Sequence, residues 1–506
     1  NKGGGHVKLL IWHGPTADLG KFIALAKDSP SEWRVPPKPP AKPEQELITK
    51  GMLGADDGPF AVDTFTLPYE NPHKSLMFVS GVDFLPGGEL VVCTAHGDVW
   101  IAKPLDERLE KIVWKRFASG LYQPLGLKVV DGNIMVLERG QLTTLRDRDE
   151  DFQADGYMNT CGDWDTGGGE HSFDTCLEMD QDRNVFFFKT GDTHTPTGGC
   201  LMRVPLPKDG KVFKSEVFDT GFRHPIGLGM SPDGIVSGAD QEGNWMPATR
   251  LDRYQKGGFY GDMRAHHRAT PPKIYDAPLC WLPRQLDNSA GGQVWVPKGQ
   301  WGPLGGKMLH LSYGRCRVMQ VLQEEVDGQH QGGAVNLGLN FLSGVCRGRF
   351  HPKDGHLYLV GLKGWQTASV EDGCVQRVRY TGKKMYLPTS LSVHADGIRL
   401  AFSQPLDKAS AADPKRYRIE QWNYRWSGDY GSKRWSVAEP SKIGQDTVPV
   451  QSVQLLPDGQ SVFLRIKGLQ PVMQMQLHFD LTAADGQPLA GDVFNTIHKL
   501  GKPALP

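Results

Sequence analysis

The chain has 506 residues, which is more than one compact hydrophobic core of ordinary size supports, so we expect two or three folded units. Lysine and arginine together number 57, as do aspartate and glutamate, and the net charge of zero argues against a nucleic-acid partner or an anionic membrane surface. No apolar run approaches the roughly 20 residues that a bilayer-spanning helix needs, so we expect no transmembrane segment.

The composition favours an all-β fold, because 61 glycines and 36 prolines suit many tight turns between short packed strands. Residues 6–12 are predicted to form one strand, and the prolines between 36 and 43 predict a stiff linker. Residues 1–55 are therefore expected to be an N-terminal segment with a Pro-rich linker. The chain begins with Asn1, so we expect that a signal peptide or larger upstream region has been removed.

A sequence unit recurs between residues 56 and 385, where an apolar pair is followed by a turn rich in Pro, Asp and Gly and then by a β-rich run. Copies at intervals of roughly 45–65 residues are typical of a β-propeller, in which each copy is a four-stranded blade. The count of copies predicts a six-bladed β-propeller; they lie at 82–91, 125–136, 176–186, 228–236, 293–311 and 350–358.

The pattern changes after residue 385. Apolar residues alternate with polar ones, as in Val462, Leu464 and Ile466, and this alternation predicts an immunoglobulin-like β-sandwich over residues 386–506. Three tryptophans of this region either stack on sugars or belong to the core; they are Trp422, Trp426 and Trp435.

Eight cysteines are scattered along the chain without any Cys-x-x-Cys pair. This spacing argues against a zinc ribbon or an iron–sulfur site, and the chain carries no Cys-x-x-Cys-His motif for a c-type haem. The even number fits disulfides, while several apolar, strand-like contexts fit buried free thiols equally well.

One repeat is nearly literal, because Gly120–Leu127 and Gly221–Leu228 share their glycines, proline and leucine. The pair inside this frame changes from Tyr122-Gln123 to Arg223-His224. Loops on one face of a propeller carry specificity while the frame is kept, so we expect functional residues in this pair.

A histidine follows three glycines in the segment 166–175, just before a predicted strand. Glycines let the backbone approach a ligand closely, and His171 could act as a general base near neutral pH. Alternatively, His171 is only satisfied by hydrogen bonds within the turn.

Further cations occur in pairs two residues apart, which places both members of a pair on one strand face. If these side chains converge on a central funnel, they bind a multiply anionic ligand such as a quinone cofactor or an acidic sugar; otherwise they form salt bridges between blades. The predicted ligand-binding residues of this group are Arg315, Arg317, Arg347, Arg349, Lys363 and the neighbouring Trp365.

The aspartates at 147, 149, 151 and 155 have the spacing of a calcium-binding loop. Phe152 stands where such loops need glycine for a sharp turn. The segment is either a degenerate calcium loop or a solvated acidic turn.

These segments together resemble the six-bladed propellers of the soluble quinoprotein glucose and sorbosone dehydrogenases. The matching residues are Gly221–Leu228, Asp240-Gln241 and Gly257-Gly258-Phe259-Tyr260-Gly261. The family has asparagine where this chain has His224, and Trp-Pro where this chain has Asp262-Met263.

The resemblance implies a role for several residues. His171 would be the catalytic base, Gln123 would contact the cofactor pyrroloquinoline quinone (PQQ), and Arg223 would face both substrate and cofactor. The turn with Gly261 and Asp262 would hold the calcium ion of the cofactor.

The whole chain is similar to large secreted bacterial propeller proteins known as membrane-bound dehydrogenases, which are often fused to c-type cytochromes. This similarity implies a periplasmic or extracellular location and a c-type cytochrome as a possible electron acceptor.

Three functions are compatible with these residues. The first is a quinoprotein-type dehydrogenase that oxidises a sugar or sugar alcohol, with His171, Arg223 and His224 as the catalytic group. The second is a cofactor-free carbohydrate-active lyase or glycoside-cleaving propeller, in which His171 or Tyr260 is the base and arginines neutralise a uronate. The third is a carbohydrate-binding module without catalysis.

Overall fold

The computed structural model describes residues 12–28, 46–169, 171–191, 194–206 and 213–504. The chain divides into two compact units, residues 1–45 and 46–506. The predicted linker at 36–43 and all but the last residue of the strand predicted at 6–12 lie outside the described residues. No helix within the described ranges has the length and apolar character needed to cross a bilayer.

The first unit contains a helix that the all-β prediction did not include, α1 (Leu19–Asp28), preceded by the 3₁₀ turn η1 (Thr16–Asp18). Leucine, alanine and lysine in this segment are strong helix formers. The rings of Trp12 and Phe22 stack with centroids 5.9 Å apart.

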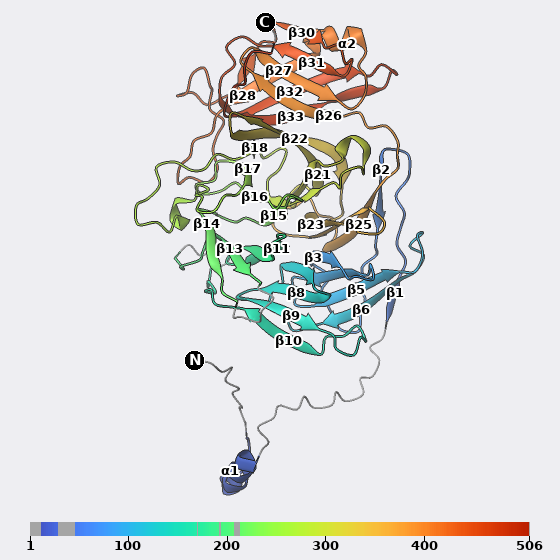
Figure 1. Cartoon of the computed structure of the whole chain (residues 1–506), viewed down its shortest axis with the longest axis vertical. Helices are drawn as coiled ribbons and strands as arrows, with labels where there is room; N and C mark the ends of the chain where they lie inside the picture. Colours follow the sequence, from blue (N-terminus) through green and yellow to red (C-terminus); the bar gives the residue numbers. More distant parts are fainter. Residues whose placement is uncertain (1–11, 29–45, 170, 192–193, 207–212, 505–506) are drawn as a thin grey trace. The chain divides into compact units, whose positions relative to one another are not determined.

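In the described part of the second unit, residues 60–380 form six groups of four antiparallel strands (Figure 1). We call them blades 1 to 6. Blade 1 contains β3 (Val79–Phe84), β4 (Leu90–Thr94), β5 (Val99–Pro104) and β6 (Ile112–Ala118); blade 2 contains β7 (Gly126–Val130), β8 (Asn133–Glu138), β9 (Gln141–Arg146) and β10 (Gly156–Cys161); blade 3 contains β11 (Asp174–Met179), β12 (Asn184–Lys189), β13 (Cys200–Pro205) and β14 (Glu216–Thr220).

Blade 4 contains β15 (Gly227–Met230), β16 (Val236–Asp240), β17 (Thr249–Arg253) and β18 (Cys280–Leu282); blade 5 contains β19 (Ala290–Trp295), β20 (Met308–Ser312), β21 (Arg317–Val326) and β22 (Gln329–Asn340); blade 6 contains β23 (Gly344–Phe350), β24 (Leu357–Leu362), β25 (Gly373–Tyr380) and β2 (Phe60–Thr64). The 3₁₀ turns η2 (Met263–Ala265) and η3 (Gly302–Leu304) lie in connections.

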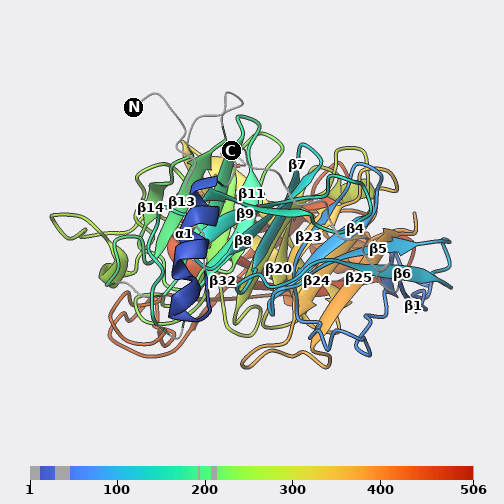
Figure 2. The same cartoon turned by 90° about the horizontal axis from the view of Figure 1, so that it is seen from below.

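The first strands of the six blades form a ring. Strands β3, β7, β11, β15, β19 and β23 contact one another in this order, and β23 contacts β3 again. Three of them, β7, β11 and β23, are labelled in Figure 2. This arrangement is consistent with a β-propeller whose innermost strands surround a central axis.

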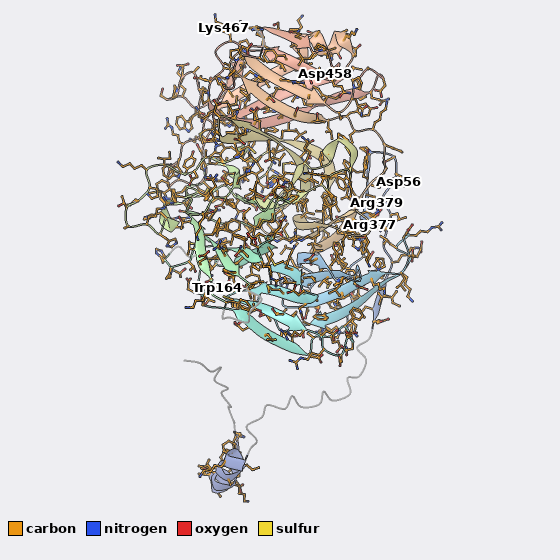
Figure 3. All side chains as sticks on the ribbon, in the orientation of Figure 1. Asp56, Trp164, Arg377, Arg379, Asp458 and Lys467 are labelled. Carbon is orange, nitrogen blue, oxygen red and sulfur yellow. The ribbon has the colours of Figure 1, made fainter. Side chains whose placement is uncertain are left out.

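The ring is closed by β2, which comes from the start of the propeller and pairs with β25, the last of its strands, in the register Val62↔Val378. Asp63 of β2 is fully buried and accepts hydrogen bonds from Arg377 (2.8 Å) and Arg379 (2.7 Å). The two arginines lie close together in Figure 3. Burial acts to raise the pKa of Asp63, but the hydrogen bonds from Arg379, the Gly54 amide and Arg377 outweigh it and lower the pKa.

The N-terminal segment predicted to end at residue 55 differs from the structure. Strand β1 (Leu47–Thr49) pairs with β6 and extends blade 1 to five strands. Its three residues are too few to show a clear alternation in the sequence.

The residues after 385 form two β-layers around one apolar core that includes Ile398, Leu464 and Leu477. The first sheet has the strand order β26 (Pro388–His394), β27 (Gly397–Phe402), β31 (Ser461–Arg465), β30 (Ser452–Leu455). The second sheet has the strand order β33 (Pro488–Ile497), β32 (Val472–Thr482), β28 (Tyr417–Trp422), β29 (Asp446–Val448). The helices α2 (Lys408–Ala412) and η4 (Pro414–Arg416) follow β27 and precede β28 in the sequence. We call residues 386–506 the sandwich; the immunoglobulin-like assignment stays a prediction.

The second sheet of the sandwich is continuous with blade 5. Strand β33 pairs with β22 through Gly333↔Asn495 and Ala334↔Phe494, which makes one sheet of eight strands. The sandwich therefore shares backbone hydrogen bonds with the propeller and is not a tethered module.

All eight cysteines lie in the described residues, and each is free and buried. The structure therefore agrees with the interpretation of the cysteines as buried free thiols and not with the interpretation as disulfides.

Replacing Asp63 tests the closure of the ring. We expect Asp63→Asn to lower the free energy of unfolding by roughly 3–5 kcal/mol, because two arginines lose a buried carboxylate. Asp480→Asn is the control, since Asp480 forms an exposed pair with Arg416, and it should cost less than about 1 kcal/mol. Urea unfolding measures both variants; equal losses would show that Asp63 does not secure the closure.

Candidate functional site

A cavity of about 500 Å³ lies at one end of the propeller axis. All six blades contribute to its lining, mostly through residues next to the first strand of each blade. The contributors include Ser80, Gln123, His171, Arg223, Ser289 and Arg347. The cavity is therefore the place where the convergence of side chains that the sequence predicts can be compared with the structure.

The turn that carries Arg223 and His224 is held by one buried carboxylate. Gly221 has φ +86°, and Asp240 at the end of β16 accepts the backbone N–H groups of Arg223 (2.6 Å) and His224 (2.9 Å). Burial raises the pKa of Asp240 to about 6.

The equivalent turn of blade 2 is built in the same way. Gly120 has φ +80°, and Glu138 at the end of β8 accepts the N–H of Tyr122 at 2.6 Å. The shared frame therefore builds the turn, and the Arg223-His224 pair is free to differ from Tyr122-Gln123.

His171 is positioned by a polar group beneath its loop. Thr190 Oγ1 donates to the backbone oxygen of His171 (2.7 Å), and Lys189 forms a fully buried ion pair with Asp174 (3.1 Å) at the start of β11. The exposed imidazole of His171 stacks on that of His224, with centroids 4.4 Å apart and planes at 28°.

The two imidazoles differ in their electrostatics. Burial lowers the pKa of His224 to about 3, and the positive charge of Arg223 acts in the same direction. His224 is therefore neutral near pH 7 and offers a flat, uncharged surface to the ring of His171.

Arg223 faces the cavity between two elements. Its Nη1 donates to the backbone oxygen of Glu242 (3.2 Å), and its guanidinium lies 5.0 Å from the ring centroid of Tyr430. A Cβ at Gly243 would lie 1.9 Å from Arg223 Nε, so only glycine leaves room for this arrangement.

Tyr430 lines the cavity although it belongs to the sandwich. The sequence analysis missed it, because an exposed tyrosine in a long loop has no periodicity that points to a site in another domain. Tyr313 was also missed, although it lies two residues before Arg315 of the predicted Arg315–Arg317 motif and could have been found there.

Arg347 and Arg349 both reach the propeller axis from β23, but they differ in position. Arg347 lines the cavity and donates to the backbone oxygens of Leu125 (3.0 Å) and Ile226 (2.6 Å). Arg349 lies outside the cavity lining and pairs with Glu178 at 2.7 Å. Both arginines thus connect blades, and only Arg347 lies at the cavity floor.

Three predicted cations lie outside the cavity lining. Arg315 donates to the backbone oxygen of Arg284 (2.7 Å), Arg317 donates to Asn340 (3.3 Å), and Lys363 is exposed. Cys316 adopts φ +53°, so β21 begins only at Arg317 and the period-two argument fails for this pair.

Trp365, which follows this lysine after one residue, lines the cavity and is 89% exposed. It therefore offers an open aromatic face at the cavity mouth.

The Tyr260–Asp262 turn does not fit a calcium ion. Arg250 donates to the backbone oxygen of Tyr260, Trp426 Nε1 donates to that of Gly261 (2.8 Å), and Arg264 pairs with the carboxylate of Asp262 (2.6 Å). Neither Gly261 nor Asp262 lines the cavity. The oxygens expected to bind a metal are thus engaged by two guanidinium groups and an indole.

The charge of the lining does not fit PQQ, a planar tricarboxylate. Most donors of Arg347 are used by backbone oxygens, which leaves Arg223 as the accessible guanidinium, and Glu242 adds a carboxyl group. Among the described residues of the lining, one accessible positive charge lies beside one acidic group, which suits a ligand with a single carboxylate better than one with three.

Tyr260 does not fit the role of a base. Its ring is 2% exposed, and burial raises the pKa of its hydroxyl well above the usual range. Its hydroxyl accepts the backbone N–H of Gln255 (3.0 Å), so it belongs to the packing of blade 4.

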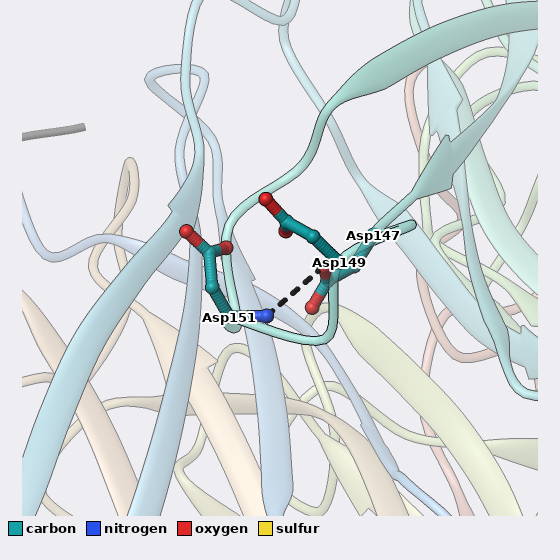
Figure 4. Close-up of side chains that lie close together, drawn as sticks. All are labelled: Asp147, Asp149 and Asp151. Carbon is teal, nitrogen blue, oxygen red and sulfur yellow. Dashed lines mark hydrogen bonds between the residues drawn. The ribbon is translucent and has the colours of Figure 1, made fainter. Parts of the chain in front are cut away.

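The acidic loop predicted as a degenerate calcium site lies between β9 and β10 (Figure 4). One carboxylate oxygen each of Asp147, Asp149 and Asp151 lies within 4.8 Å of the others. The Asp147 carboxylate accepts the backbone N–H groups of Asp151 and Phe152, which act against the burial that raises its pKa. Both sequence interpretations of this loop stay open.

The tryptophans of the sandwich are not sugar platforms at the cavity. Trp422 is fully buried with Arg434 over its ring, and the ring of Trp435 lies under Arg425. Trp426 packs against Trp245 and Tyr275 of the propeller, with ring centroids 5.4 Å and 5.2 Å away.

The chain is structurally similar over 60–68% of its length to glucose, aldose sugar and pyranose dehydrogenases. An oxidoreductase described as a glucose dehydrogenase from Thermus thermophilus shares 18% identity with a TM-score of 0.46, over 60% of this chain and 97% of that one. The PQQ-bound aldose sugar dehydrogenase of Streptomyces coelicolor shares 15% identity with a TM-score of 0.44, over 67% and 99%.

The calcium structure of a Trichoderma reesei carbohydrate-active enzyme of family AA12 shares 12% identity with a TM-score of 0.48, over 66% of this chain and 98% of that one. No TM-score among these reaches 0.5, so we draw neither a function nor a cofactor from them. No protein-family model matches the chain, and no curated protein sequence matches it.

The lowered pKa of His224 predicts a loss of stability in acid. A group with a pKa of 6.5 when unfolded and about 3 when folded stabilises the protein above pH 6.5, and this contribution falls as the pH drops towards 3. His224→Gln should remove this dependence, so the melting temperature of the variant relative to the parent should rise as the pH is lowered through this range.

Calorimetric melting between pH 7 and pH 3.5 measures the effect. His96→Gln is the control, because His96 is exposed, and its curve should run parallel to that of the parent. A His224→Gln curve that also runs parallel would contradict the burial of a neutral imidazole.

Proposed function

We propose that the axial cavity is the active site of a carbohydrate-active enzyme that binds a sugar with one carboxylate, a uronate, and removes a proton from it. The observation that carries this proposal is the combination, in one cavity, of a stacked imidazole pair with one accessible guanidinium, that of Arg223, among the lining residues that the structure describes. Arg223 binds the carboxylate, and His171 is the general base.

The composition of the lining supports a polyhydroxylated ligand. Neutral side chains such as Gln123, Gln241 and Asn288 offer donors and acceptors for hydroxyl groups, and Trp365 and Tyr313 offer aromatic faces for the apolar side of a sugar ring. The volume of about 500 Å³ leaves room for more than one sugar unit.

The chemistry follows from these positions. A carboxylate held by Arg223 makes the proton on the adjacent carbon more acidic, because the guanidinium stabilises the negative charge that develops there. His171 takes that proton, the released electron pair forms a carbon–carbon double bond, and the bond to the glycosidic oxygen on the next carbon breaks. The departing oxygen takes up a proton, which completes a β-elimination.

Quinone-dependent sugar oxidation is the competing function, since the motifs resemble those of quinoprotein dehydrogenases. It requires calcium-dependent binding of PQQ, whereas the donors around Gly261 and the charge of the lining argue against it. Titration of PQQ with and without CaCl₂ separates the two functions; tight, calcium-dependent binding would favour the dehydrogenase. A periplasmic or extracellular location and a cytochrome partner stay predictions.

Replacing Arg223 tests the carboxylate contact. Arg223→Ala should weaken the binding of an oligogalacturonide by roughly tenfold to a hundredfold, because a charge-assisted hydrogen-bonding pair is lost. Arg223→Lys should restore only part of the affinity, since lysine supplies a point charge and not a bidentate contact. Isothermal titration of the full chain measures both.

Lys363→Ala is the matched control, because Lys363 is a nearby cation outside the lining. Its affinity should equal that of the parent. Equal losses in Arg223→Ala and Lys363→Ala would show that the binding is a general effect of surface charge.

Replacing His171 tests the base. His171→Ala should lower the rate of elimination by at least about a hundredfold while the affinity for the oligogalacturonide changes little, because the imidazole acts on the proton and Arg223 binds the carboxylate. The ultraviolet absorbance of the unsaturated product measures the rate. A variant that keeps the parental rate would exclude His171 as the base.

A further inference from the structure

The Tyr260–Asp262 turn is bound by donors from two domains. Arg250 and Arg264 come from the propeller, whereas Trp426 comes from the loop between β28 and β29 of the sandwich. Arg250 is fully buried, and its ion pair with Asp252 holds the guanidinium in place. A metal ion at this turn would have to displace the donors that already occupy the backbone oxygens of Tyr260 and Gly261 and the carboxylate of Asp262.

We propose that Trp426 fixes this turn in the place where a metal ion would otherwise be needed, so that the sandwich loop, which also supplies Tyr430 to the cavity lining, is anchored on the propeller without calcium. The indole N–H reaches Gly261 O at 2.8 Å, and it supplies a directed donor without a charge. The sandwich, a domain of the same chain, thereby orders this turn in place of a bound cation.

The packing of Trp426 supports this role. Its ring lies among the rings of Trp245, Phe259 and Tyr275, with centroids 5.2–6.4 Å away in tilted, edge-on geometries. Aromatic pairs of this kind contribute beyond their buried area, so the indole is held in one orientation.

Backbone hydrogen bonds attach the loop that contains Trp426 to propeller residues beside the cavity. Trp245 N donates to Ser427 O (3.1 Å), and Gly431 N donates to Gly243 O (3.0 Å). Gly243 is the residue against which Arg223 packs, and Tyr430, which precedes Gly431, lies over the guanidinium. The loop that supplies Trp426 therefore also positions Arg223, the residue that binds the carboxylate in the proposed function.

The first test concerns the turn itself and needs no ligand. Trp426→Phe keeps an aromatic ring and removes the N–H, so the backbone amides of residues 257–265 should exchange hydrogen about tenfold faster than in the parent. Trp435→Phe is the control, since the ring of Trp435 lies under Arg425 of the same loop, and it should leave this exchange unchanged. Equal exchange in the two variants would overturn the proposal.

The second test uses calcium alone. The parent and Asp149→Asn are titrated with CaCl₂, because the acidic loop at Asp147–Asp151 is the other place where calcium could bind. No binding in either protein, or binding in the parent that Asp149→Asn abolishes, supports a turn without calcium. Binding of equal strength in both, together with slower exchange at residues 257–265, would overturn the proposal.

The third test depends on the proposed function. The affinity for an oligogalacturonide should be the same in EDTA and in CaCl₂, and Trp426→Phe should weaken it at least about fivefold while Trp435→Phe does not. A chain that binds no oligogalacturonide contradicts the proposed function, and the exchange and calcium experiments then still decide the role of Trp426. Affinity that rises with CaCl₂ in Asp149→Asn would overturn the proposal.

Discussion

A buried guanidinium on the propeller axis organises the end of the molecule that holds the cavity. Arg347 from blade 6 donates to backbone oxygens that precede the first strands of blades 2 and 4, so three alternate blades meet at one side chain. The Arg347 side chain is almost completely buried, and the hydrogen bonds of its Nη1 and Nη2 groups to backbone oxygens offset part of the cost of desolvating the charge. The carbonyl groups of Leu125 and Ile226 are thereby held at fixed positions beside Gln123 and His224. The floor of the cavity and the turns around it are consequently one hydrogen-bonded assembly.

The sandwich contributes to the same end of the molecule in two ways. It continues the sheet of blade 5 through β33, and its loop between β28 and β29 contacts blade 4 next to Arg223. Because β33 pairs with β22, the outer strand of blade 5, the sandwich also covers a sheet edge that would otherwise expose unpaired backbone groups. Fold and site thus depend on the same domain contact, which links the integrity of the cavity to residues far away in the sequence.

Much of the propeller could be predicted from the sequence, because its information is local. Each blade contains turns of Pro, Asp and Gly between apolar runs, and such signals are confined to short segments. The same applies to the turn with Arg223 and His224, whose glycine and proline frame is repeated in blade 2. His171 and Gln123 were identified for similar reasons, as residues beside glycine-rich turns that precede strands.

The remaining features depend on contacts that no local pattern encodes. Tyr430 and Trp426 reach the propeller from another domain, and nothing in their own segment indicates that contact. Arg315 and Arg317 were misjudged because one residue in a left-handed conformation breaks the strand between them. The hydrogen bond to the backbone oxygen of Gly261 could not be predicted either, because its donor Trp426 lies 165 residues away in the sequence.

The separate burial of the eight cysteines has a consequence for the redox chemistry of the chain. Burial raises the pKa of Cys93 to about 12 and that of Cys346 to about 11, and the other thiols are likewise enclosed. Disulfide exchange proceeds through the thiolate, and a thiol that is neither ionised nor accessible does not take part in it. The native fold therefore protects its cysteines against oxidants, so that mispairing is a hazard only before the blades have packed, while the thiols are still open to solvent.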